Sequence, residues 1–281
     1  MVQVTAGDFT PPSGPPTNAS AAFGKISEYA DATGISTDGI TFGAVSASDI
    51  VVETLASNGK ILNVAGGISG NDSKHIYAAQ GDFGVTAMAV AEDTNQVTRN
   101  LADGIRLNGG SLTATADGGI LAGAMVAGQG IDTEAGAITL AGSDMFLSGQ
   151  AGIEIYAGAL SGSNDNDADT FAHGVSADGG NKVQVATDGA LLIDVSAENT
   201  GAGANAEVIS TAVYGDGTKL MTMYSKGDAE ITATATGGVS AKASAIDLGR
   251  DNAVDFFHLA SEGNINITAE AGTDSTATDA G

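Results

Sequence analysis

The feature that most constrains the fold is a strand–turn–strand pattern that recurs along the chain. Its clearest copy, residues 256–269, has an apolar run, a turn at Gly263, and Ile265 and Ile267 alternating with polar residues. Related stretches surround Gly59, Gly189 and Gly227. Alternation with a period of two places apolar side chains on one face of a β-strand, and glycine permits the tight turn. The pattern therefore predicts a chain of β-strands joined by short turns.

The spacing of these copies indicates a repeat. From Gly152 onward, glycines that open equivalent copies recur about every 37 residues. Earlier copies, at Gly104, Gly119 and Gly136, follow one another at shorter steps of about 16 residues. Each later unit has room for about three strands, for example residues 153–156, 171–176 and 182–186. Self-similarity at such a period indicates stacked supersecondary units.

Three all-β architectures fit this repeat. A single chain can wind as a β-solenoid, or several chains can intertwine as a β-prism or triple β-helix. A sandwich or jelly roll of hairpins is the third alternative. The chain holds 41 Gly, 8 Phe, 5 Tyr and no Trp, and small residues suit thin, closely stacked coils. Composition therefore favours the solenoid or prism over the sandwich.

The N-terminal part differs from the rest. Residues 1–19 hold all four prolines and are expected to form an extended arm. Residues 20–38 are expected to cap the stack, with a short helix over 20–30 in which Ser20 is the N-cap and Phe23, Ile26 and Tyr29 share a face. Residues 39–281 are expected to form the β-repeat domain.

The charge balance excludes one class of partner. With 34 acidic and 10 basic residues, the net charge is −24. Binding to nucleic acid or to anionic membrane surfaces needs clustered Lys and Arg, which this chain lacks. The N-terminus has neither a basic start nor an apolar run, which indicates no signal peptide, and no apolar stretch is long enough to cross a membrane. We therefore expect no nucleic acid partner and no membrane insertion.

No pattern for catalysis stands out. The chain has no Cys, and its histidines, His75, His173 and His258, lie far apart without metal or triad spacing. No nucleophile elbow, phosphate-binding loop or dinucleotide motif occurs. Solenoid enzymes that cleave polysaccharides place carboxylates on successive coils, so this activity stays open as an alternative. The expectation is that the chain is not an enzyme and has no cofactor.

One acidic stretch is a candidate calcium site. Asp165, Asp167 and Asp169 alternate as in the first half of a calcium-binding loop. The glycine that such a loop needs is replaced by Thr170, and the distal glutamate by Ser176. The alternative is a solvated polar loop between two strands.

Two segments carry a family resemblance. Residues 262–269 and 227–233 resemble the short glycine-led repeats of phage tail spikes and fibres, and more weakly those of haemagglutinin-type repeat adhesins. This resemblance implies a non-enzymatic structural virion protein that self-associates as a homotrimer or polymer, at a virion or extracellular surface. It also implies contact with a cell-surface glycan or another virion protein. An extracellular filament or adhesin subunit of a cellular organism is the alternative.

Overall fold

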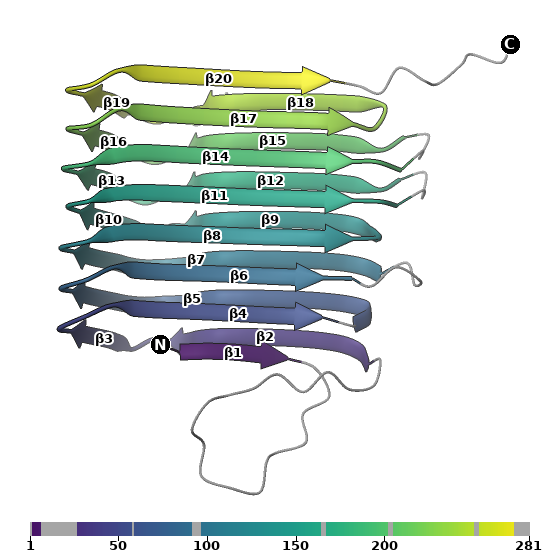
Figure 1. Ribbon diagram of the computed structural model, residues 1–281, viewed down its shortest axis with the longest axis horizontal. Helices are drawn as coiled ribbons and strands as arrows, with labels where there is room; N and C mark the ends of the chain where they lie inside the picture. The colour runs from purple at the N-terminus through teal and green to yellow at the C-terminus, as the bar shows by residue number, and fades with distance from the viewer. Residues whose placement is uncertain are drawn as a thin grey trace, which may run out of the picture.

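The computed structural model describes residues 2–6, 27–57, 59–91, 97–163, 167–201, 205–249 and 253–272. These residues form a parallel β-solenoid in which the chain passes through three strands per coil (Figure 1). Each strand pairs in parallel with the equivalent strand of the next coil. The expected all-β solenoid is therefore confirmed, and it is built by a single chain. Among these described residues there is no membrane-spanning helix.

One face of the solenoid is an eight-stranded parallel sheet, which we call the front sheet. In Figure 1 its strands lie in front, from β1 at the bottom to β20 at the top. They are β1 (Val2–Ala6), β4 (Ile50–Ser57), β6 (Phe83–Val90), β8 (Gly119–Gly128), β11 (Gly152–Ser161), β14 (Ala190–Asn199), β17 (Ala229–Gly237) and β20 (Ile265–Gly272).

The other two faces are joined into one sheet, because the long strands β5 (Gly59–Ala79) and β7 (Val97–Ala116) run through both. The second face continues with β2 (Ser27–Asp38), β9 (Gly130–Ala141), β12 (Asp169–Asp178), β15 (Glu207–Asp216) and β18 (Ser240–Asp247). The third face continues with β3 (Thr41–Ser46), β10 (Asp144–Gly149), β13 (Lys182–Thr187), β16 (Leu220–Ser225) and β19 (Phe256–Ser261).

The pairing register explains both spacings in the sequence. Gly119 pairs with Gly152 on the front sheet, whereas Gly136 lies on the second face opposite Asp103. The short steps of about 16 residues therefore alternate between the second face and the front sheet, and the steps of about 37 residues complete a coil. The predicted three-strand unit after Gly152 corresponds to β11, β12 and β13.

The core consists of columns of equivalent residues from successive coils. One column of the front sheet runs through Val52, Val85, Ala122, Ile155, Ile193 and Ile231, all at most 1% exposed. Burying an aliphatic side chain of this size contributes roughly 1.5–3 kcal/mol. Successive coils are closely stacked: a Cβ at Gly67 would overlap the carbonyl oxygen of Gly104 in the next coil. This is why the composition is rich in small residues.

Aspartates at several corners connect one coil to the next by hydrogen bonds. Asp82 N donates to Asp49 Oδ1 at 2.9 Å, and Gly119 N donates to Asp82 Oδ1 at 2.7 Å. Asp144 and Asp228 accept backbone N–H groups from the following coil in the same way. A carboxylate that accepts a backbone N–H makes a charge-assisted hydrogen bond. Part of the acidic composition therefore has a structural role.

The N-terminal expectations are partly corrected. Residues 27–38 form β2, which pairs with β5, so the expected helix is wrong over 27–30. Ala30 and Ala32 are buried while Asp31 is exposed, so a period of two prevails once β5 supplies a partner. Residues 20–26 and the Pro-rich segment 11–16 lie outside the described residues. Residues 2–6 of the expected arm form β1, which pairs with β4.

Candidate interaction surface

The acidic stretch proposed for calcium is only partly described. Asp167 Oδ1 accepts a hydrogen bond from Asn205 Nδ2 at 3.2 Å, and Asp169 is the first residue of β12. Asp165 lies outside the described residues. Within the described part of the chain, no three His, Cys, Asp or Glu side chains gather as metal ligands. The calcium hypothesis stays a prediction that depends on Asp165.

His75 lies inside the solenoid. Its Nε2 is 2.8 Å from Thr37 Oγ1 and its Nδ1 is 3.2 Å from Tyr77 Oη. Both ring nitrogens are satisfied if Tyr77 donates to Nδ1 and Nε2–H donates to Thr37, which in turn donates to the Ser69 carbonyl. Burial lowers the pKa of His75 and raises that of Tyr77. The neutral imidazole is thus a polar part of the core.

A polar cluster on the second face joins three coils through Asp103, Thr139 and His173. Thr139 Oγ1 lies 3.2 Å from Asp103 Oδ1 and 2.9 Å from His173 Nε2. Gly136 makes room for it, because a Cβ there would lie 2.9 Å from Asp103 Oδ1 and collide with the imidazole. In a nucleophilic triad the imidazole lies between hydroxyl and carboxylate, and here the hydroxyl lies between the other two. Sequence reasoning missed this cluster, for which Gly136 is a weak signal.

Charges around this cluster are paired. Arg106 Nε lies 3.1 Å from Asp103 Oδ2, and Arg99 Nη2 lies 3.5 Å from Glu134 Oε2. Burial raises the pKa of Asp103 to about 6, opposed by the charge of Arg106 and the hydrogen bond from Thr139. Burial lowers the pKa of His173, with Glu134 opposing and Arg106 adding to the shift. The cluster is a cross-coil network rather than an open site.

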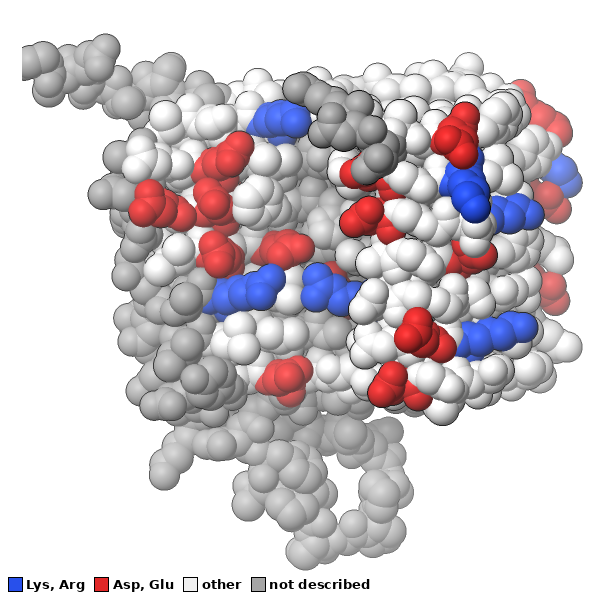
Figure 2. Space-filling model, turned by 180° about the vertical axis from the view of Figure 1, so that it is seen from behind, with Lys and Arg blue, Asp and Glu red and all other residues white. Residues whose placement is uncertain are grey.

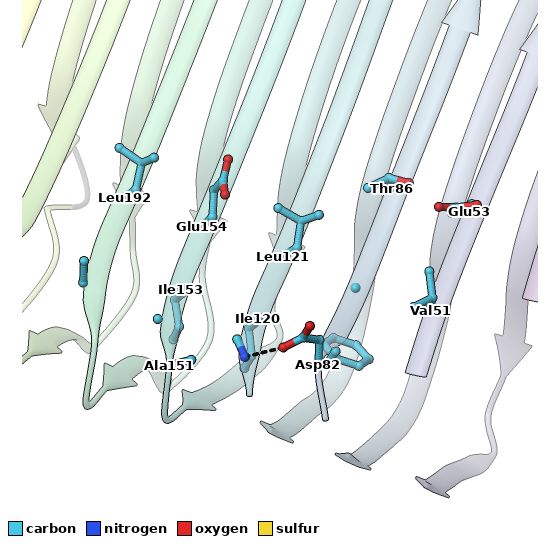
Figure 3. A pocket seen from close by; sticks show the side chains of 15 residues that line it. Val51, Glu53, Asp82, Thr86, Ile120, Leu121, Ala151, Ile153, Glu154 and Leu192 are labelled. Carbon is cyan, nitrogen blue, oxygen red and sulfur yellow. Dashed lines mark hydrogen bonds between the residues drawn. The ribbon is translucent and has the colours of Figure 1, made fainter. Parts of the chain in front are cut away.

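The front sheet has a hollow on its outer surface, with a volume of about 600 Å³ (Figure 3). It forms where Gly84, Gly119 and Gly152 carry no side chains, between the apolar side chains of Val51, Leu121 and Leu192. Three carboxylates, those of Glu53, Asp82 and Glu154, also line it. Figure 3 shows Glu154 and Glu53 on opposite sides of Leu121 and Thr86. The hollow thus has an apolar surface with acidic side chains at its borders.

Tyr156 lies beside this hollow, flat on the sheet. A Cβ at Gly123 would collide with the Tyr156 ring, so the ring extends from β11 over β8. Burial raises the pKa of Tyr156, and the charges of Glu154 and Glu53 raise it further. Both carboxylates therefore act on the same region of the surface, where their negative potentials add.

The separation of Glu53 and Glu154 argues against hydrolysis of glycosidic bonds by this pair of carboxylates. They lie on β4 and β11, three strand-to-strand steps apart, because β6 and β8 lie between. At about 4.8 Å per step, and with an offset of two residues along the strands, their Cα atoms lie roughly 16 Å apart. The carboxylates of glycosidases lie about 5–9.5 Å apart. The backbone separation is wider than this range, so the two carboxylates would reach it only if both side chains turned toward each other across β6 and β8.

The C-terminal end of the described solenoid is open. Ile265 and Ile267 of β20 are 44% and 51% exposed, although they continue columns in which Ala229 and Ile231 are 0% exposed. Every residue of β20 is exposed. The strand pairs with β17 on one edge, and among the described strands no other lies against its second edge.

Comparisons with protein families, curated proteins and solved structures found no match to this chain. The resemblance of its repeats to those of tail spikes and repeat adhesins therefore stays a prediction.

Proposed function

We propose that the chain is a non-enzymatic structural subunit of a particle-surface fibre, of the phage tail fibre or spike type. In this function it self-assembles through the end of its solenoid. The observation that carries the proposal is the open edge of β20, where Ile265 and Ile267 continue buried columns and no other described strand covers them.

The physical reason is that one more coil would pair with the free backbone groups of β20 and cover its apolar side chains. Unpaired strand edges are templates for pairing with another chain. A strand added to β20 would bury Ile265 and Ile267, with roughly 1.5–3 kcal/mol from each side chain. The net charge of −24 opposes unspecific contact between copies. Association is therefore expected at the end of the stack, where backbone pairing and apolar burial outweigh repulsion.

Native mass measurement of wild-type protein and two double variants tests the proposal. Wild-type protein is expected to form oligomers or polymers at micromolar concentration. The double variant Ile265→Lys/Ile267→Lys is expected to be monomeric. The matched control is Asn266→Lys/Thr268→Lys, which adds the same charge at outward positions of the same strand. The control is expected to assemble.

Two results would contradict the proposal. One is wild-type protein that stays monomeric at tens of micromolar. The other is equal assembly of the two double variants. Negative-stain images of the assemblies also distinguish two biological settings. Discrete short oligomers such as homotrimers support a virion spike, and helical polymers support the extracellular filament or adhesin subunit of a cellular organism.

A further inference from the structure

We propose that the hollow in the front sheet binds an extended segment of a partner protein that carries two Lys or Arg side chains four residues apart. One cationic side chain pairs with Glu53 and the other with Glu154. The proposal uses a different surface from the open edge of β20 and does not depend on self-assembly.

The first argument is charge. No Lys or Arg occurs in any described strand of the front sheet, and none lines the hollow. The ion pairs formed within the described part of the chain all lie elsewhere: Arg99–Glu134, Arg106–Asp103 and Lys226–Asp188. Figure 2 shows acidic and basic side chains together on the opposite side of the molecule. Within the described residues, the carboxylates of the hollow therefore have no cationic side chain of this chain beside them. A partner can supply one.

The second argument is the apolar surface between the two glutamates. The strands β6 and β8 contain no charged residue. Beside the hollow, Met88 and Met125 project from these strands and are 42% and 43% exposed. Apolar patches bordered by polar residues mark interaction sites, and flexible methionines adapt to a partner surface. An apolar side chain between the two cations would therefore pack against this surface.

The third argument is spacing. From Glu53 to Glu154 the path crosses three strand-to-strand steps and two residues along a strand, which gives about 16 Å between the Cα atoms. In an extended peptide, residues i and i+4 face the same side and lie about 14 Å apart. The flexible stems of Lys or Arg cover the difference. The fitting motif is Lys/Arg-x-apolar-x-Lys/Arg, with the apolar residue above Leu121 and Thr86.

A second copy of the chain fits this surface less well. Front sheets packed against each other would bury carboxylates without cations, because the described front strands contain none. An unpaired buried charge is strongly destabilising. A neutral glycan would likewise leave the two carboxylates without a counter-charge. A protein segment with two cationic side chains and an apolar one between them can pack against the apolar walls and pair with Glu53 and Glu154.

Fluorescence anisotropy with a labelled, end-blocked peptide Lys-Thr-Leu-Thr-Lys tests the proposal. The double variant Glu53→Gln/Glu154→Gln is expected to weaken binding at least tenfold. The matched control is Glu198→Gln/Glu230→Gln, with the same substitutions at exposed positions of β14 and β17. It is expected to stay within twofold of wild type. The peptide Lys-Lys-Thr-Leu-Thr, with the same composition, is expected to bind more weakly.

Three outcomes would overturn the proposal: no binding at millimolar peptide, equal loss in the two double variants, or displacement of the peptide by a neutral oligosaccharide. Circular dichroism and thermal melting of each variant show whether it is folded. Repeating the titration with Ile265→Lys/Ile267→Lys tests whether peptide binding depends on assembly. This monomeric variant is expected to bind the peptide as wild type does.

Discussion

His75 Nε2 lies 2.8 Å from Thr37 Oγ1, so a side chain in one coil is hydrogen-bonded to a side chain of the preceding coil inside the solenoid. In the other coils the equivalent positions hold apolar residues such as Leu112 and Met145. The buried imidazole is therefore a polar side chain in an otherwise apolar column. Its effect on the unfolding free energy depends on pH.

The unfolding free energy is expected to depend on His75 at mildly acidic pH. Burial lowers the folded-state pKa below 6.5, so the unfolded chain binds more protons once pH falls through 6.5. Stability is then lost by at most about 1.4 kcal/mol per pH unit for this one proton. Urea unfolding at several pH values between 5 and 7.5 measures the slope, which His75→Leu is expected to reduce. His258→Leu, on the outer face of β19, is the control that keeps it; a full slope in His75→Leu would refute the assignment.

The ionisation of Asp103 is expected to change the unfolding free energy with pH in the opposite direction to that of His75. Its folded-state pKa of about 6 lies above the ordinary 3.8, so the folded protein binds more protons between these values. Stability therefore falls as pH rises through this window, by a total on the order of 3 kcal/mol. The same urea measurements on Asp103→Asn are expected to lack this contribution. Asp132→Asn, at an exposed position of β9, is the comparison, and identical pH profiles for both variants would argue against it.

Gly67→Ala is expected to destabilise the fold by about 1–3 kcal/mol, because overpacking shifts a close-packed core. Its Cβ would overlap the Gly104 carbonyl oxygen and lie 2.5 Å from Val85 Cγ1. Gly43→Ala is the matched control, since the nearest atom to a Cβ there is 3.6 Å away. Chemical unfolding of the two variants measures the difference, and equal stabilities would contradict the tight contact between coils.

Asp144→Ala is expected to loosen the corner that leads into β13. Asp144 Oδ1 accepts hydrogen bonds from Asn181 N at 2.7 Å and Lys182 N at 3.0 Å. Both donors are exposed, so water can replace the carboxylate and the expected loss is about 0.5–1.5 kcal/mol. Faster hydrogen exchange at the two amides is the expected readout. Asp144→Asn keeps a side-chain oxygen and should show a smaller change; unchanged exchange in Asp144→Ala would count against this role.

Local pattern was enough to predict much of the fold. The alternation after Gly152 and the period of about 37 residues predicted a three-strand coil, and β11, β12 and β13 confirm it. Alternation and turn glycines act over a few residues, so they can be read without knowing the neighbours. The helix expected over 20–30 fails at residues 27–30 because that segment finds a pairing partner in β5, and a strand partner far along the chain overrides a short helical pattern.

The sequence by itself determined the repeat, the alternation of faces and the excess of acidic charge. Only the tertiary structure decided which side chains from different coils meet. His75 meets Thr37, Asp103 meets His173 through Thr139, and Glu53 and Glu154 border one hollow. The physical reason is register: a shift of one residue between coils moves every side chain to the other face of its sheet. Register is set by how the stacked coils pack together, across more than thirty residues of chain.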